Sequence, residues 1–143
     1  MVLELRKIEG AKCFYCAQAL TEADVDHFIP FSQYPRDLAR NFVVAHPTCN
    51  RSKSGTLAGG PHLERWLERI CRNTEAIDEE GMAAGMLVDA QVSRNIAAWV
   101  HMAAIARGGS AWITPGRYEA VGQRYKSYFG AQGRNLTRLY RVA

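Results

Sequence analysis

The sequence has no long apolar run, and no stretch approaches the ~18 consecutive apolar residues that a membrane helix needs. A membrane-spanning protein is therefore not expected. The first residues, Met1 to Lys7, also lack the apolar stretch and the small-residue cleavage site of a secretory signal, so we expect a cytoplasmic protein. With 143 residues, 48% of them hydrophobic, the chain can bury one ordinary core and form one or two small domains.

Acidic residues are scarce near the end of the chain. After Ala104 the only acid is Glu119, whereas the net charge of the whole chain is +4. The basic residues of this part are either a solvated helical surface or a strip that faces phosphates, because Lys and Arg release counterions from nucleic-acid backbones. They are Arg107, Arg117, Arg124, Lys126, Arg134, Arg138 and Arg141.

Cysteine is also rare, and its spacing is informative. Cys13 and Cys16 form a C-x-x-C pair, and His46 and Cys49 form a second pair with the same spacing. In the reducing compartment expected here, such spacing favours a metal over disulfides. Two short-spaced pairs predict a tetrahedral structural zinc site of Cys3His type. The fourth cysteine, Cys71, is interpreted as a small buried residue of a helix.

Patterns of apolar residues predict an α+β protein in two regions. Residues 1–60 form a small zinc-stapled ββα module, and residues 61–143 form a mostly helical region for oligomerisation or nucleic-acid docking, with the boundary at Gly59-Gly60-Pro61. The module has a lead-in helix before Gly10, strands at 23–28 and 41–45, and a helix from Thr48. The helical region has helices at 63–72, 86–106, 114–128 and 135–140.

The first strand and the second helix carry residues suited to cutting a phosphodiester bond. His27 is a base that works near neutral pH and can activate water. Asp26 and Asn50 offer oxygen atoms to a divalent cation such as Mg²⁺ or Mn²⁺. Asn41, at the start of the second strand, could pin the loop that follows His27.

The segments around Cys13–Cys16, Asp26–Pro30, Arg40–His46 and Thr48–Ser54 resemble the HNH endonuclease family, the ββα-metal nucleases, over about residues 11 to 57. The resemblance implies that His27 is the general base, that Asn41 orients it, and that Asp26 and Asn50 bind the catalytic cation. It also implies a zinc site, in which His46 stands where the family usually has cysteine. Asn50 replaces the histidine of the third motif position.

Several alternatives stay open at this point. Arg51 and Lys53 either contact phosphate near the cation or are only solvated. The chain is either a nuclease, with DNA as the favoured substrate, or a non-catalytic zinc module that binds nucleic acid or protein. The helical region could form a homo-oligomer or recruit the nuclease to a restriction, anti-phage or guide-directed assembly.

Overall fold

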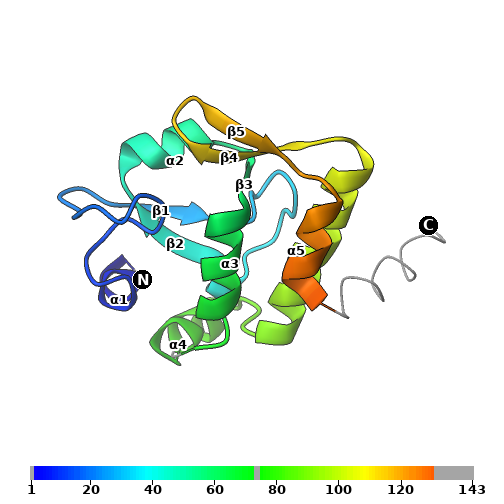
Figure 1. Cartoon of the computed structure of the whole chain (residues 1–143). Helices are drawn as coiled ribbons and strands as arrows, with labels where there is room; N and C mark the ends of the chain where they lie inside the picture. The colour runs from blue at the N-terminus through cyan, green and yellow to red at the C-terminus, as the bar shows by residue number, and fades with distance from the viewer. Residues whose placement is uncertain (1, 73–74, 131–143) are drawn as a thin grey trace.

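A computed structural model describes residues 2–72 and 75–130 of the chain. Up to residue 58 the chain forms α1 (Val2–Ile8), β1 (Asp24–His27), the 3-10 helix η1 (Ala39–Asn41), β2 (Phe42–Ala45), α2 (Pro47–Lys53) and β3 (Leu57–Ala58). From residue 60 on it forms α3 (Gly60–Arg69), α4 (Glu75–Ala83), α5 (Ala90–Ala106), β4 (Ser110–Thr114), β5 (Arg117–Ala120) and the 3-10 helix η2 (Gln123–Phe129). The molecule is therefore of the α+β class, with a ββα unit first and a largely helical part after it (Figure 1).

The two predicted strands of the module pair as an antiparallel hairpin, β1–β2. Asp24 lies opposite Ala45 and His27 opposite Phe42, so His27 stands at the end of the pairing. Because side chains alternate along a strand, Asp24 and Asp26 share one face of β1 and His27 points to the other. All four residues of β2 are buried, so this hairpin forms an inner wall of the protein.

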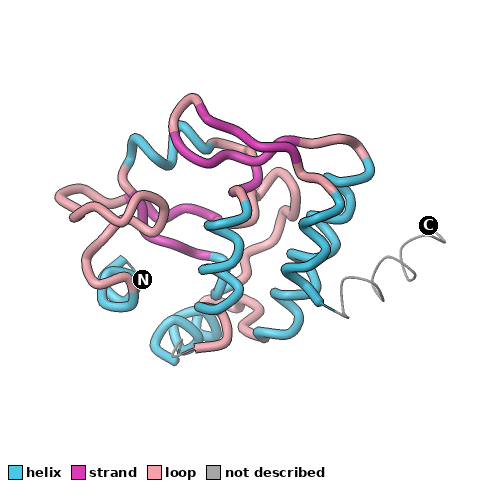
Figure 2. The backbone as a smooth tube through the Cα atoms, viewed as in Figure 1, coloured by secondary structure: helices cyan, strands magenta, loops and turns pink. Residues whose placement is uncertain are grey.

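A second sheet joins residues on both sides of the predicted boundary at 60/61. The short β3 pairs in parallel with β4, and β4 pairs antiparallel with β5 (Figure 2). The β4–β5 hairpin lies across α2, and the indole of Trp112 donates a hydrogen bond of 2.9 Å to the hydroxyl of Ser52 in that helix (Figure 1).

One apolar core also crosses this boundary. The rings of Phe28 and Trp66 stack with centroids 4.9 Å apart, and the rings of Tyr15 and Trp112 meet edge to face at 5.3 Å. Trp66 and Trp112, both from the second region, are almost fully buried in the same cluster as Phe28 and Tyr15. The ββα module thus packs on aromatic side chains that the helical region supplies.

A smaller cluster holds α1 and α4 against the outer side of β2, with Leu5, Phe42, Val44 and Ile77 at its centre. None of the helices in the described ranges combines the length and the apolar character that a membrane span requires.

The structure corrects the prediction of a helix over residues 114–128. Residues 110–120 form the β4–β5 hairpin instead, and helical turns return only in η2. Pro115-Gly116 makes the hairpin turn, where Gly116 has a φ of +77°, a conformation that other residues rarely adopt. The tyrosine spacing that suggested a helix therefore comes partly from an edge strand.

Other boundaries also differ. Helix α5 starts at Ala90 rather than Met86, because the Asp89 carboxylate caps it by accepting from the Val92 N–H at 3.0 Å. Helix α4 was not predicted, and the expected helix at 135–140 lies outside the described residues. Cys71 is exposed at the end of α3, so the prediction that it is buried is wrong.

Candidate metal centre and active site

The four predicted zinc ligands come together in the structure. The Sγ atoms of Cys13, Cys16 and Cys49 and a ring nitrogen of His46 all lie within 4.8 Å of one another. Donors around a tetrahedral zinc lie about 3.5–3.8 Å apart, given bond lengths of about 2.0–2.3 Å. The cluster joins the turn that carries Cys13 and Cys16 to the start of α2 and fits a structural Cys3His zinc site.

The imidazole of His46 is oriented as a metal ligand needs. Its Nε2 lies 2.8 Å from the carbonyl oxygen of Ala19, and its Nδ1 lies 3.2 Å from Sγ of Cys16. When Nε2–H donates to Ala19, the lone pair of Nδ1 is directed at the thiols. A backbone carbonyl that fixes the tautomer in this way is the usual outer partner of a histidine ligand.

The thiols differ in their acidity. Burial, together with the neighbouring Cys13 and Cys16, raises the pKa of Cys49 to about 12. Burial also acts on Cys13, but the backbone N–H groups of Cys16, His46 and Tyr15 outweigh it, and the pKa of Cys13 is lowered. A thiolate in this cluster disfavours the ionisation of the neighbouring thiols, because like charges repel. A divalent cation bound among them stabilises the thiolate form of all of them.

His27 stands at the end of β1 with its side chain 30% exposed. Its Nε2 lies 2.9 Å from Oδ1 of Asp37, in the loop that joins β1 to η1. The ring also contacts the aromatic rings of Phe31 and Phe42, with centroids 5.6 and 4.8 Å away. When Nε2–H donates to Asp37, the other ring nitrogen, Nδ1, keeps a lone pair that can accept a proton.

Asn41 is buried and closes the loop behind His27. Its Oδ1 accepts from the N–H of Ile29 at 2.7 Å, and its Nδ2 donates to the carbonyl oxygen of the same residue at 2.9 Å. The backbone of Asn41 also accepts from the N–H of Phe28 at 2.8 Å. These three bonds fix the backbone immediately after His27.

Asp26 is nearly buried, on the face of β1 opposite His27. Its Oδ2 accepts from the hydroxyl of Tyr15 at 2.5 Å and lies 3.1 Å from Nζ of Lys53. The Lys53 ammonium is fully buried and also donates to the carbonyl oxygen of His27 at 3.1 Å. Lys53 is therefore not solvated but ties α2 to β1 beneath the histidine, whereas Arg51 is exposed.

Asn50 contacts β1 two residues before Asp26. Its Nδ2 donates to Oδ2 of Asp24 at 3.0 Å. Asp24, Asp26 and Asn50 thus offer oxygen atoms on the side of β1 that faces α2. The contact to Asn50 is made by Asp24, whereas Asp26 is engaged by Lys53 and Tyr15.

Comparison with known families shows what this arrangement belongs to. Residues 13–58 match a family model described as HNH endonuclease. This part of the chain belongs to the HNH endonuclease family. Neither the curated proteins nor the solved structures compared with the chain gave a match. The HNH region, residues 13–58, contains β1, η1, β2, α2 and β3, and with them all the side chains of the metal centre and of the site around His27.

HNH endonucleases are phosphodiesterases, and the enzyme class predicted from the sequence is thereby confirmed. The HNH region implies nucleic acid as the partner. Three residues of its site escaped the sequence analysis: Tyr15, Asp24 and Asp37. Asp37 lies in an irregular loop with no periodic signal, and Tyr15 looked like an ordinary aromatic neighbour of the cysteines.

Proposed function

We propose that the HNH region hydrolyses phosphodiester bonds of DNA with His27 as the general base. The observation that carries this proposal is the contact of 2.9 Å between Nε2 of His27 and Oδ1 of Asp37. It gives the imidazole the orientation and tautomer in which Nδ1 can take a proton from an attacking water molecule. The exposed part of the His27 side chain leaves room for water and substrate to approach.

Asn41 acts on His27 through the backbone. Its three hydrogen bonds to Phe28 and Ile29 hold the chain that carries the imidazole, so Asn41 is a positioning residue. Asp37 is a second positioning residue, which holds the imidazole itself. The carboxylate also stabilises the imidazolium that forms when His27 accepts the proton.

Asp26 and Asn50, with Asp24 beside them, are the residues that would hold a catalytic divalent cation. Carboxylate and amide oxygens suit Mg²⁺ or Mn²⁺, and such a cation supplies positive charge for the scissile phosphate. The Lys53 ammonium pairs with Asp26 beside this set, and the exposed Arg51 contacts a nearby phosphate of the substrate strand.

Cys13, Cys16, His46 and Cys49 hold zinc in a structural role. All four side chains are protein ligands, so the site is closed and leaves no open position for substrate. The three thiols in one cluster also agree with a reducing, cytoplasmic environment. A restriction or anti-phage role and a homo-oligomer formed through the helical region stay predictions.

A plasmid-nicking assay with His27→Ala tests the proposal. We expect the wild type to nick DNA with Mg²⁺ or Mn²⁺ and to stop in a chelator, and we expect His27→Ala to keep its zinc and its circular dichroism spectrum but lose cleavage. Asp37→Asn should cut more slowly, with a changed pH profile of the rate, which a purely structural residue would not alter. Equal cleavage by wild type and His27→Ala would overturn the assignment, and binding without any cleavage would favour a non-catalytic zinc module.

A further inference from the structure

A groove of about 470 Å³ opens beside the proposed general base. One wall comes from the loop after β1 in the HNH region and carries Tyr34, Arg36 and Asp37. The other comes from the turn between α4 and α5, outside the HNH region, and carries Met86 and Leu87. Sites for small molecules and cofactors usually measure about 300–1,000 Å³, so the groove is large enough for one nucleotide.

Asp37 connects this groove to the chemistry. It lines the groove and, through its Oδ1, contacts Nε2 of His27 at 2.9 Å. A strand whose scissile phosphate lay at His27 would therefore bring its next nucleotide to the groove. Because the groove is continuous with the active site, we expect it to bind part of the substrate strand.

Three contacts hold the two walls at a fixed distance. The N–H of Ala39 donates to the carbonyl oxygen of Leu87 at 2.9 Å, within a parallel bridge between Leu38 and Leu87. The guanidinium of Arg40 makes a two-pronged pair with the carboxylate of Asp78 in α4, at 3.1 and 2.7 Å.

The third contact is steric and involves a glycine. A Cβ on Gly81 of α4 would lie 2.4 Å from the Cβ of Ala39, so this position needs glycine for the close approach of the helix. The groove is therefore built into the fold, and the HNH region alone would have only one of its walls.

The chemistry of the walls suits a nucleotide. Arg36 is exposed, and within the described ranges no acid pairs with its guanidinium, so it is free to contact a phosphate. Tyr34, Met86 and Leu87 offer apolar surface for a base or sugar, and Leu87 keeps 44% of its surface exposed there. The Asp37 carboxylate repels phosphate and so directs the phosphate toward Arg36.

We propose that this groove binds the nucleotide that adjoins the scissile phosphate of the substrate strand. The inference rests on the proposed nuclease function and assigns a role to the segment between α4 and α5. That segment completes the substrate site of the HNH region, in addition to stabilising the fold.

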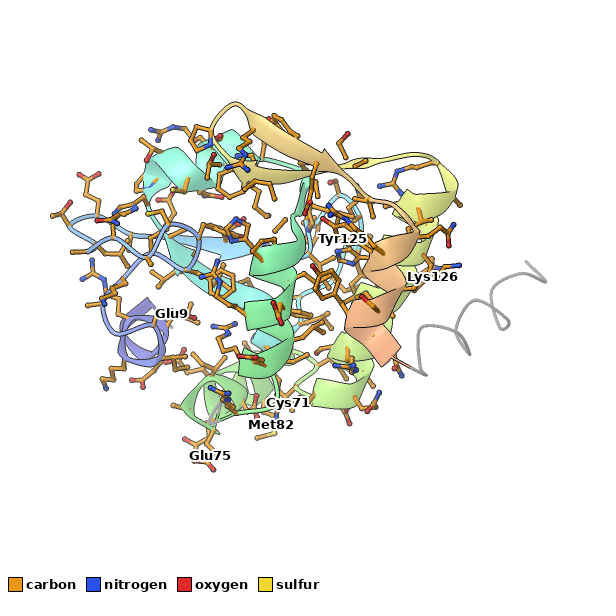
Figure 3. The ribbon with its side chains drawn as sticks, viewed as in Figure 1. Glu9, Cys71, Glu75, Met82, Tyr125 and Lys126 are labelled. Atoms are coloured by element: carbon orange, nitrogen blue, oxygen red, sulfur yellow. The ribbon has the colours of Figure 1, made fainter. Side chains whose placement is uncertain are left out.

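The test compares matched variants at neighbouring exposed positions, in a His27→Ala background that prevents cleavage. Leu87→Glu places a negative charge in the groove, and Met82→Glu places the same charge on α4, at a side chain that is 59% exposed and does not line the groove (Figure 3). Fluorescence anisotropy with labelled single-stranded and double-stranded DNA oligonucleotides gives the Kd. We expect Leu87→Glu to raise the Kd about tenfold or more, and Met82→Glu to leave it nearly unchanged.

A second pair of variants covers the case in which Leu87→Glu does not fold. Arg36→Ala should weaken binding and lower the slope of log Kd against log salt by about one, because one phosphate contact is lost. Arg72→Ala removes an exposed arginine that pairs with Glu68 and should leave the slope unchanged.

The outcomes separate this inference from the proposed function. If wild type cleaves DNA but both members of each pair behave alike, the groove is not a nucleotide site, and the nuclease assignment stands. If wild type does not cleave but binding still depends on Leu87 and Arg36, the groove stands as a binding site, and the proposed cleavage falls.

Discussion

The ammonium of Lys53 lies 3.1 Å from Oδ2 of Asp26, and this buried pair joins α2 to β1 directly beneath His27. Burial lowers the pKa of Lys53, while the negative charge of Asp26 acts in the opposite direction. The same Asp26 oxygen accepts from the hydroxyl of Tyr15, whose pKa is raised by burial and by Asp26. The carboxylate of Asp26 in β1 thus connects this strand to α2 and to the turn between Cys13 and Cys16.

Replacing Lys53 should therefore destabilise the protein strongly. Lys53→Met keeps the length and the apolar stem but leaves the Asp26 carboxylate without its positive partner in a buried place. We expect the free energy of unfolding to fall by about 3–5 kcal/mol. Urea denaturation followed by circular dichroism measures this loss. Tyr15→Phe removes one hydrogen bond to the same oxygen and no charge, so it should lose only about 1–3 kcal/mol. Similar losses for the two variants would show that charge pairing is not what makes Lys53 important.

Removing one zinc ligand should unfold the module, whereas removing Cys71, which is not a ligand, should not. Structural zinc contributes about 10–16 kcal/mol of binding free energy in small zinc-finger peptides. Cys49→Ala should therefore lose bound zinc and cooperative unfolding. Cys71→Ala, at the exposed end of α3, should keep both (Figure 3). Elemental analysis of the purified variants gives the zinc content, and thermal melts with and without a chelator give the stability. A folded, zinc-free Cys49→Ala protein would contradict the structural role.

The active region was predictable because its residues occur in short contiguous motifs. Residue type and spacing alone predict the function of Asp26-His27 and of the two cysteine-containing pairs. The partners that set the geometry were less accessible. Asp37 lies ten positions after His27 in a loop, and only the folded chain shows that it contacts the imidazole.

The burial of Lys53 was equally hidden, since lysine in a helix next to a metal ligand looks like a phosphate contact. The prediction for residues 114–128 failed for a different reason. The tyrosines and Val121 happen to follow helical spacing, but Pro115 and Gly116 make a turn and Trp112 packs β4 against α2. Tertiary packing overrode the local pattern there.

The HNH region is not expected to fold without the helices that follow it. A fragment of residues 1–60 would lack Trp66, which stacks on Phe28, and Trp112, which meets Tyr15. These contacts bury large aromatic surfaces, which dominate the stability of a small core. We expect the fragment with zinc to give a poorly dispersed amide NMR spectrum, and the whole chain a dispersed one. A well-dispersed spectrum of the fragment would instead support an independent domain that ends near residue 60.

His101 should make stability depend on pH. The imidazole is buried in α5 against Tyr125 and Phe129; its Nδ1 contacts the carbonyl oxygen of Ala97 at 2.6 Å, and its Nε2 has no hydrogen-bond partner within the described residues. Burial, with a smaller contribution from the nearby Arg107, lowers the pKa of His101 to about 4. The unfolded chain, with an ordinary histidine pKa of about 6.5, therefore binds the proton more readily. Stability contributed by neutral His101 is complete above about pH 6.5 and is lost as the pH falls toward 4, by about 3 kcal/mol in total.

His101→Phe keeps the ring packing but cannot titrate, so the difference in unfolding free energy between wild type and variant should shrink or reverse as the pH falls through this window. Urea denaturation of both proteins, at several pH values across this window, measures the difference. Both proteins retain the same zinc ligands, so the effect of protonating those ligands cancels in the difference. A difference that stays constant with pH would show that His101 is not held neutral by its surroundings.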